Sequence, residues 1–235
     1  MKKKHLLTLI TNTMIALIII TVFSYAFVSG SIFVSASTVG DPIYQGNTEK
    51  RQISLMINVY WGTEYIKPML DVLAEKNAKA TFFVGGSWVA KNDAVLKQIY
   101  DSGNEIGSHG FNHRDQNKIS LELNRQEILT THNLVKETIG LEMNLFAPPS
   151  GAFNKNTLLA AYELGYKTIM WTRDTIDWRD RNEDTIFSRA IKNPQNGDLI
   201  LMHPIKETLG ALPRIIDYLK SLGFSFVTVT QNLAE

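Results

Sequence analysis

The most informative stretch of the sequence is Glu105-Ile106-Gly107-Ser108-His109-Gly110-Phe111-Asn112-His113, in which a short apolar run ends in two histidines four residues apart. Such a run is typical of a short buried strand. Neutral imidazole is the commonest protein ligand for zinc-like metals, and two rings in a loop after a strand can face one ion. The same spacing also occurs in structural, hydrogen-bonded histidines, so the pair alone leaves both interpretations open.

The same unit, an apolar run followed by a polar loop, recurs along the chain from Gln52 onward. The runs cover residues 53–57, 80–84, 105–108, 144–146, 168–171, 199–202 and 224–227. Between them, apolar residues follow helical spacing, as in Ile66, Met69, Leu70 and Leu73. Parallel strands joined by crossover helices produce this alternation. The sequence therefore predicts an α/β fold, a distorted (β/α)7-type barrel of parallel strands.

Residues that can bind metals or transfer protons follow the predicted strands. In β/α barrels the chemistry lies at the C-terminal ends of the strands. The residues at these positions are Asn58, His109, His113, Asp174, Asp177 and His203. Their shared placement favours one metal or catalytic site at a single rim of the barrel. Simpler interpretations stay open for each of them: structural histidines, and aspartates that cap the following turn.

Composition excludes several classes of function. The 235 residues contain no cysteine, which excludes disulfides, thiolate metal sites and cysteine nucleophiles. The formal net charge is +1, but without Lys2, Lys3 and Lys4 the chain has 21 basic against 23 acidic side chains. No basic stripe is present, so nucleic acid is not an expected partner.

The N-terminus has the layout of an export signal. Three lysines precede a nearly continuous apolar stretch over residues 6–28, and Val34-Ser35-Ala36 offers a cleavage site. The stretch is also about as long as a membrane-spanning helix requires, so a cleaved signal and an uncleaved anchor both remain open. We expect a signal peptide or membrane anchor over 1–36, a linker over 37–51 and an extracytoplasmic domain, membrane-anchored or secreted, over 52–235.

Short motifs in this order resemble those of the polysaccharide deacetylases that share the NodB homology domain, also called carbohydrate esterase family four. His109-Gly110-Phe111-Asn112-His113 is similar to the family's His-Ser/Thr-x-x-His. Asp174-Thr175-Ile176-Asp177-Trp178 is similar to Asp-x-x-Asp-Trp, and Leu201-Met202-His203 to Leu-x-His. Ala147-Pro148-Pro149-Ser150 corresponds to Arg-x-Pro-Tyr. The resemblance covers about residues 52–230.

The resemblance implies a metal-dependent hydrolase that removes acetyl groups from cell-wall glycan, either peptidoglycan or chitin-like N-acetylglucosamine. It implies that His109 and His113 bind a divalent, Zn-like metal. It also implies that His203 donates a proton and that Asp177 orients it, with Asp174 in the same catalytic motif. The residues implied in substrate binding are Ser150, through its backbone N–H, with Pro149, Trp178 and Leu201.

The first motif departs from the family pattern. The family's Thr-Phe-Asp-Asp-Gly falls on residues 56–60, where Asn58 replaces the catalytic base and Val59 replaces a metal-binding carboxylate. Ala147 replaces the arginine that belongs beside that base. An amide cannot accept the proton, and general-base catalysis is typically worth about 10²–10⁴ in rate. Glu64 and Asp115, in adjoining loops, are candidates to substitute. A sporulation-associated branch of the family also lacks the second aspartate.

Two functions therefore remain open. We favour a weakened metal-dependent deacetylase of cell-wall glycan, and the alternative is a catalytically inactive glycan-binding or scaffold protein on the same barrel. Cell-wall polysaccharide is the expected partner in both cases, with membrane contact through the N-terminal segment, and no oligomeric state is predicted. Trp61, Trp88 and Trp171 are predicted to be core residues, and Trp178 either packs in the core or contacts the glycan.

Overall fold

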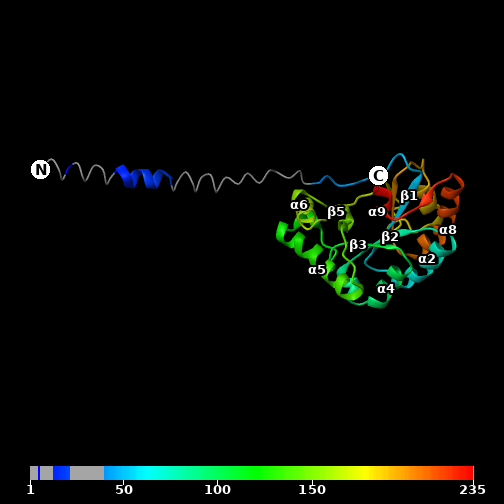
Figure 1. Ribbon diagram of the computed structural model, residues 1–235. Coiled ribbons are helices and arrows are strands. Elements are labelled where there is room, and N and C mark those ends of the chain that lie inside the picture. Colours follow the sequence, from blue (N-terminus) through cyan, green and yellow to red (C-terminus); the bar gives the residue numbers. More distant parts are fainter. Residues whose placement is uncertain (1–4, 6–12, 22–39, 235) are drawn as a thin grey trace. The chain divides into compact units, whose positions relative to one another are not determined.

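The computed structural model describes His5, residues 13–21 and residues 40–234. Residues 13–21 are helical, and within the described ranges no helix is long and apolar enough to cross a membrane. Most of the predicted export segment, including the predicted cleavage site, lies outside the described residues. The chain from Gly40 to Glu235 forms a compact unit, and this unit carries the sheet and its surrounding helices (Figure 1).

A sheet of eight parallel strands forms the centre of this unit. The strands are β1 (Gln52–Val59), β2 (Ala80–Val84), β3 (Glu105–Ser108), β4 (Leu145–Phe146), β5 (Lys167–Thr168), β6 (Arg173–Asp174), β7 (Asp198–Met202) and β8 (Ser225–Phe226). Their order is β5-β4-β3-β2-β1-β7-β6, and β8 pairs with the first residues of β1. The α/β prediction is confirmed. The predicted barrel is an open, curled half-barrel, because β5 and β6 end the order without pairing to each other.

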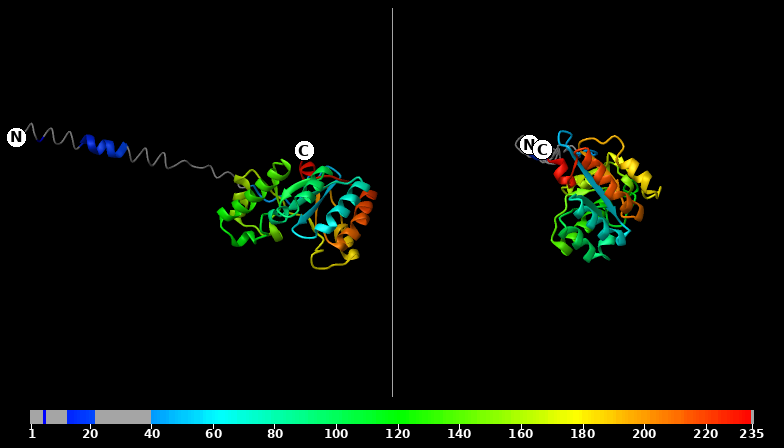
Figure 2. Two further views of the ribbon diagram at one scale, coloured as in Figure 1. Left: turned by 90° about the horizontal axis from the view of Figure 1, so that it is seen from below. Right: turned by 90° about the vertical axis from the view of Figure 1, so that its right-hand side faces the viewer.

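Helices surround the sheet, as Figures 1 and 2 show. The longer ones are α2 (Thr63–Glu75), α4 (Asp93–Asp101), α5 (Leu121–Ile139), α6 (Lys155–Glu163), α7 (Glu183–Ala190) and α8 (Lys206–Ser221). The short ones are α3 (Gly86–Val89), α9 (Val229–Leu233) and the 3₁₀ turns η1 (Gln116–Lys118) and η2 (Pro149–Gly151). In α2, the predicted face of Ile66, Met69, Leu70 and Leu73 is the buried face.

Strand β1 divides the apolar core in two, because successive side chains of a strand point to opposite faces. Its odd-numbered residues belong to the large cluster between the sheet and the helices: Ile53, Leu55, Ile57 and Val59. Met56 belongs to a smaller cluster on the inner face of the half-barrel. Asn58 follows Met56 at the strand period and shares its face. The first motif is therefore split, with Asn58 turned inward and Val59 turned toward the helices.

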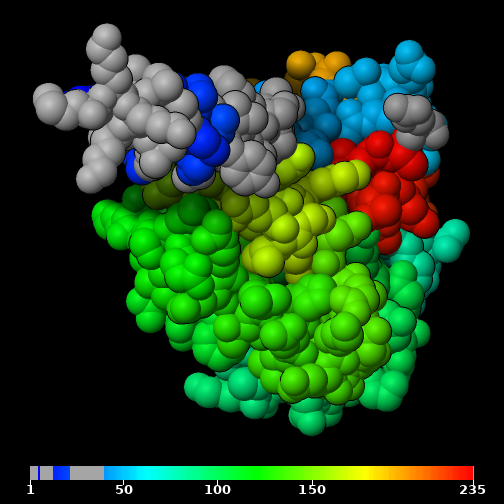
Figure 3. All heavy atoms as spheres, turned by 60° about the vertical axis from the view of Figure 1, so that its left-hand side comes forward, coloured from blue at the N-terminus to red at the C-terminus, as the bar shows by residue number. Residues whose placement is uncertain are grey.

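The inner face is closed at the end where the strands begin. There α9 packs beside residues 40–50, a segment predicted to belong to a linker. The backbone N–H of Asn47 donates to the carbonyl of Asn232 at 2.8 Å, whereas Ile43 pairs further along, in a parallel bridge with Ile169 just past the end of β5. Figure 3 shows these two parts of the chain, light blue and red, side by side. The inner face is thus left open where the strands end.

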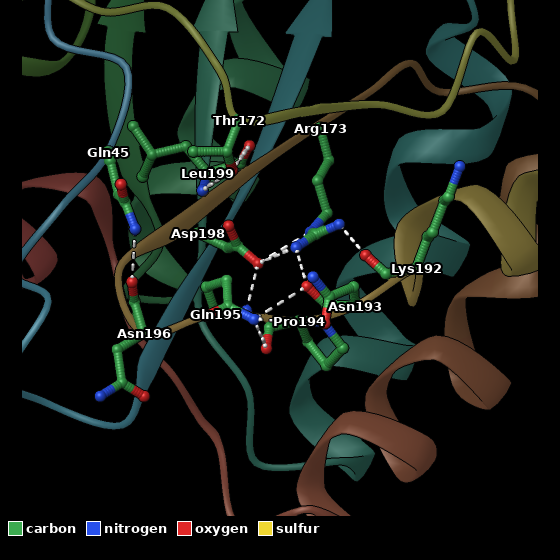
Figure 4. A network of polar contacts seen from close by, with 10 residues as sticks. All are labelled: Gln45, Thr172, Arg173, Lys192, Asn193, Pro194, Gln195, Asn196, Asp198 and Leu199. Carbon is green, nitrogen blue, oxygen red and sulfur yellow. Dashed lines mark hydrogen bonds and ion pairs between the residues drawn. The ribbon is translucent and has the colours of Figure 1, made fainter.

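Strand β6 is held to β7 by a buried ion pair (Figure 4). Arg173 Nε lies 2.7 Å from Asp198 Oδ2, and the two side chains are 14% and 2% exposed. The guanidinium also donates to the carbonyls of Lys192 and Asn193, and Asp198 Oδ2 accepts the backbone N–H of Gln195 at 2.7 Å. This network fixes the start of β6, and with it the position of the aspartate that comes next in the chain.

Candidate functional site

A pocket of about 400 Å³ opens where the strands end. Its wall consists of Asn58, Trp61, His109, His113, Ser150, Trp171, Asp174, Trp178, Leu201 and His203. Eight of the ten residues predicted for the site belong to this wall. The other two, Asp177 and Pro149, are buried behind it. The structure therefore brings residues at or just beyond the ends of six strands to one place.

The two histidines of the second motif lie against each other on the wall. Their ring centroids are 5.1 Å apart, and His109 is 2% exposed. His109 Nδ1–H donates to the carbonyl of Ala147 at 2.8 Å, which leaves Nε2 as the nitrogen with the lone pair. Burial lowers the pKa of His109 to about 3, and His113 adds to this effect. Burial also lowers the pKa of His113. Both rings are therefore neutral at pH 7.

The loop between these histidines is held by a buried carboxylate, Glu127 of α5, which is 3% exposed. Its Oε2 accepts the backbone N–H groups of Phe111 and Asn112 at 2.8 and 2.7 Å, and Oε1 lies 3.1 Å from Arg114 Nε. Gly110 has a φ of 70°, and a Cβ there would lie 3.3 Å from Glu127 Oε2. This left-handed backbone explains glycine at the position where the family carries Ser or Thr.

His203 is fixed by Asp177, whose side chain is fully buried. The ring Nδ1 lies 2.7 Å from Asp177 Oδ1, and the backbone N–H of His203 donates to Oδ2 at 2.7 Å. Thr208 Oγ1 also donates to Oδ2, at 2.6 Å. These contacts set the orientation of the imidazole and place its proton on Nδ1. Trp61 stacks on the same ring, with centroids 5.4 Å apart and planes 7° from parallel.

Three tryptophans line the pocket. Trp61 is 41% and Trp178 is 51% exposed, so the prediction that Trp61 is a core residue is wrong. Trp171 contacts the inner core cluster but also lines the pocket, so the core prediction holds for it only in part. Trp88 is buried as predicted, and its Nε1 donates to Thr63 Oγ1 at 2.8 Å. Trp61 lies two residues beyond the end of β1. This closeness to a strand end is the feature of the sequence that could have indicated a place in the pocket.

The fourth motif makes a sharp bend at the pocket. Asp174 Oδ1 accepts the backbone N–H of Ile176 at 2.7 Å, and Ile176 has a φ of 52°. A β-branched residue rarely adopts this left-handed conformation, and it persists only where the surroundings impose it. Here Thr175 supplies the restraint, because its Oγ1 donates to the carbonyl of Leu201 at 2.9 Å. Burial raises the pKa of Asp174.

The pocket offers a divalent metal fewer ligands than a catalytic metal site usually has. Catalytic zinc sites use three protein ligands and one open position. His109 and His113 supply two imidazoles, whereas Val59 is fully buried in the cluster between sheet and helices. Across the described residues, no group of three or more His, Cys, Asp and Glu side chains is arranged to hold a metal ion. The residues present therefore do not fit a three-ligand site for the predicted Zn-like cofactor.

Neither substitute base reaches the pocket. Glu64 lines a separate surface groove next to it. Asp115 Oδ1 accepts the backbone N–H of Asn117 at the start of η1, and its other oxygen pairs with Lys118 at 3.0 Å. Asn58 is 4% exposed, and its Oδ1 has no hydrogen-bond partner in the part of the chain that the structure describes. A neutral amide thus occupies the base position.

Comparison with known proteins identifies the family. A sequence model described as polysaccharide deacetylase matches residues 45–169. The chain belongs to the polysaccharide deacetylase family. A peptidoglycan-N-acetylglucosamine deacetylase of Bacillus cereus is 34% identical over 175 residues, which cover 72% of this chain and 82% of the relative. The resemblance drawn from the motifs is confirmed.

Other members of the family are also similar to this chain. The uncharacterized protein YlxY of Bacillus subtilis is 39% identical over 195 residues, which cover 83% of this chain and 61% of YlxY. This chain thus spans about three fifths of that relative's length. The crystal structure of a CE4 family pseudoenzyme from Bacillus anthracis has a TM-score of 0.81 at 35% identity and covers 83% of this chain and 69% of that one. A mutant of that pseudoenzyme, described as having restored enzymatic activity, also has a TM-score of 0.81.

Proposed function

We propose that this protein binds N-acetylated cell-wall glycan in the cleft of a polysaccharide deacetylase and turns that glycan over weakly or not at all. The observation that carries the proposal is the amide of Asn58, which stands at the base position while Glu64 and Asp115, the two predicted substitutes, lie outside the pocket. The proposed ligand follows from the Bacillus cereus relative, which is named for peptidoglycan N-acetylglucosamine. The similarity to a pseudoenzyme supports the loss of turnover.

Two separate losses weaken the chemistry. Asn58 cannot take a proton from water, a role typically worth about 10²–10⁴ in rate. Val59 leaves two neutral imidazoles without an anionic partner, and such a set holds divalent metals less selectively. The side chain of Val59 also faces the helices, so restoring a carboxylate by substitution would not by itself place it in the pocket.

The pocket keeps what binding a sugar requires. Trp61 and Trp178 expose large faces at the rim, on which the C–H faces of sugar rings pack. Inside, neutral His109 and the oriented imidazole of His203 offer polar contacts next to Leu201. A concave site with an apolar wall and a few fixed polar groups is typical of a ligand-binding pocket.

A weak deacetylase is the second candidate, and one arrangement favours it. The His203–Asp177 pair has the geometry of an oriented acid. Asp174 is the one carboxylate in the described wall, so it would have to serve as the base. If the protein is a weak deacetylase of this kind, Asp174→Asn abolishes acetate release. If the protein only binds glycan, there is no acetate release for this substitution to remove.

We also propose that the domain works outside the cytoplasmic membrane, since residues 1–36 have the pattern of an export signal. Mass spectrometry of the mature N-terminus from fractionated cells tests this. An N-terminus at Ser37 supports secretion, an intact N-terminus in the membrane fraction supports an anchor, and an intact protein in the cytosol contradicts the proposal.

The main test measures binding and turnover on one sample of the full chain. Calorimetry with a tetramer of N-acetylglucosamine should detect binding. Acetate release from the same tetramer, with added divalent metal, should lie at least about 100-fold below that of the Bacillus cereus deacetylase assayed beside it. Comparable acetate release would establish an enzyme instead, and a failure to bind both this tetramer and peptidoglycan fragments would refute the proposal.

A further inference from the structure

Arg189, on α7, holds both ends of the turn that carries the fourth motif. Its Nη1 donates to the backbone carbonyl of Thr175 at 3.0 Å, and its Nη2 donates to Asp180 Oδ2. The side chain of Arg189 is 28% exposed, so most of it lies against the protein. A guanidinium presents several N–H donors in one rigid plane. Here that plane joins a carbonyl on one side of the turn to a carboxylate on the other.

The turn between these two contacts is strained and needs such support. Ile176 has a φ of 52°, a conformation that is costly for a β-branched residue. The carbonyl of Ile176 accepts the backbone N–H of Asp180 at 3.0 Å, which closes the turn. The hydroxyl of Thr175 restrains the first side of the turn through its bond to Leu201. Arg189 adds a restraint that spans the turn from one side to the other.

Two residues that shape the pocket lie inside this turn. Asp177 is fully buried, and its two oxygens contact the ring Nδ1 and the backbone N–H of His203. Trp178 comes next in the chain and is 51% exposed in the pocket wall. Both residues lie between the two points that Arg189 holds. A shift of the turn would therefore move the support of the imidazole and the aromatic wall together.

We infer that Arg189 is a positioning residue for the pocket, which acts through the turn on Asp177 and Trp178 without touching the ligand. Arg189 does not belong to the described pocket wall, so replacing it leaves the groups that face the glycan chemically unchanged. This role rests on the proposed function, because glycan affinity is the property that it controls. Arg179 offers a contrast: its side chain is 56% exposed, and in the described part of the chain its guanidinium bonds to Asp180 alone.

Nuclear magnetic resonance of the full chain reads the turn directly. The Nδ1–H of His203, hydrogen-bonded to Asp177, and the indole N–H of Trp178 give separate proton signals. In Arg189→Met both signals should move. The indole signal of Trp88, which is buried and bonded to a threonine outside the pocket wall, should stay where it is. A general loss of stability would not single out the first two signals at a temperature well below melting.

Calorimetry with the N-acetylglucosamine tetramer measures the consequence for binding. Arg189→Met should weaken the affinity at least about ten-fold. Arg189→Lys keeps the charge but loses the rigid fork, so its affinity should lie between that of Arg189→Met and that of the wild type. Arg179→Met is the matched control, because it removes the other guanidinium bonded to Asp180, and it should leave both the signals and the affinity unchanged.

The possible failures of the two proposals can be told apart. Unmoved signals of His203 and Trp178, or wild-type affinity, in a folded Arg189→Met protein would overturn the inference. If that variant does not fold, Arg189→Lys takes its place in the same comparison. Signals that move as expected, in a protein whose wild-type form binds neither the tetramer nor peptidoglycan fragments, would overturn the proposed function and leave the effect of Arg189 on the turn established.

Discussion

The Oε2 atom of Glu127 lies 2.7 Å from the backbone nitrogen of Asn112, in the middle of the loop that joins His109 to His113. The same oxygen accepts the neighbouring N–H of Phe111. A carboxylate on a helix thus fixes the backbone between two pocket histidines. Bonds from N–H groups to a buried ionised oxygen are stronger than neutral ones. The geometry of the histidine pair therefore depends on α5 as much as on β3.

Replacing Glu127 with Gln should destabilise the protein and loosen this loop. The amide keeps the shape but loses the charge that two backbone donors and Arg114 share, so we expect a loss of about 2 kcal/mol in the free energy of unfolding. Urea denaturation measures it. Glu122→Gln is the matched control, because that carboxylate on the same helix is largely exposed. If both variants unfold at the same urea concentration, Glu127 does not hold the loop.

The buried pair of Arg173 and Asp198 should matter far more than the surface ion pairs. Arg173→Met leaves a carboxylate that is 2% exposed without its charge partner, which typically costs about 3–5 kcal/mol. By contrast, Lys67→Met breaks an exposed pair with Asp71 and should change stability by less than about 1 kcal/mol. Chemical denaturation of both variants checks the difference. A stable Arg173→Met protein would show that β6 does not need this network.

Stability should fall as the pH drops below the ordinary histidine pKa, in part because of His109. Burial depresses the pKa of the folded ring from 6.5 to about 3. The stability linked to this group is therefore fully present above pH 6.5 and is lost as the pH falls toward 3. Between pH 7 and pH 5 the expected loss is on the order of 2 kcal/mol. The slope should be smaller in His109→Gln, and ring ¹⁵N shifts should show His109 neutral at pH 5. A ring that protonates near pH 6 would contradict the burial argument.

Whether substitutions restore deacetylase activity should depend on which positions are changed. Asn58→Asp with Ala147→Arg returns the base and its neighbour to the inner face, and acetate release from N-acetylglucosamine tetramers should rise by up to about 10²–10⁴. Val59→Asp should instead cost more than about 3 kcal/mol, because it places a carboxylate in the apolar layer between the sheet and the helices. Acetate assays and melting curves of the double variant and of Val59→Asp separate these effects. A well-folded Val59→Asp protein that gains activity would show that the end of β1 can turn its side chain into the pocket.

The exposed face of Trp61 should contribute directly to glycan affinity. Trp61→Ala removes an aromatic surface from the rim and should weaken binding of the N-acetylglucosamine tetramer about ten-fold. Tyr218→Ala removes a comparably exposed ring on α8 and serves as the control. Titration calorimetry of the two proteins checks this. Equal affinity in Trp61→Ala and wild type would place the sugar elsewhere in the pocket.

Helices and strands could be predicted from the sequence where an apolar pattern extends over many residues. They could not be predicted where tertiary packing overrides that pattern. The face of α2 that carries Leu73 is buried as its spacing predicts. Leu129 of α5 and Tyr162 of α6 also follow helical apolar spacing in the sequence, yet each is 44% exposed. Strand β6, two residues long, was not predicted at all. Two residues have no periodicity, so only pairing with β7 defines this strand.

The chemical groups of the site, and those that are missing, could be predicted from the amino-acid sequence, because motif order and residue type need no coordinates. Tertiary structure alone decided which way those groups face. Asn58 and Val59 are neighbours in the chain, yet the pleat of β1 turns one into the pocket and the other into the helix layer. Glu127 and Trp61 acquire their places only when segments far apart in the chain pack together. Direction and proximity are properties of that packing, which no single stretch of sequence carries.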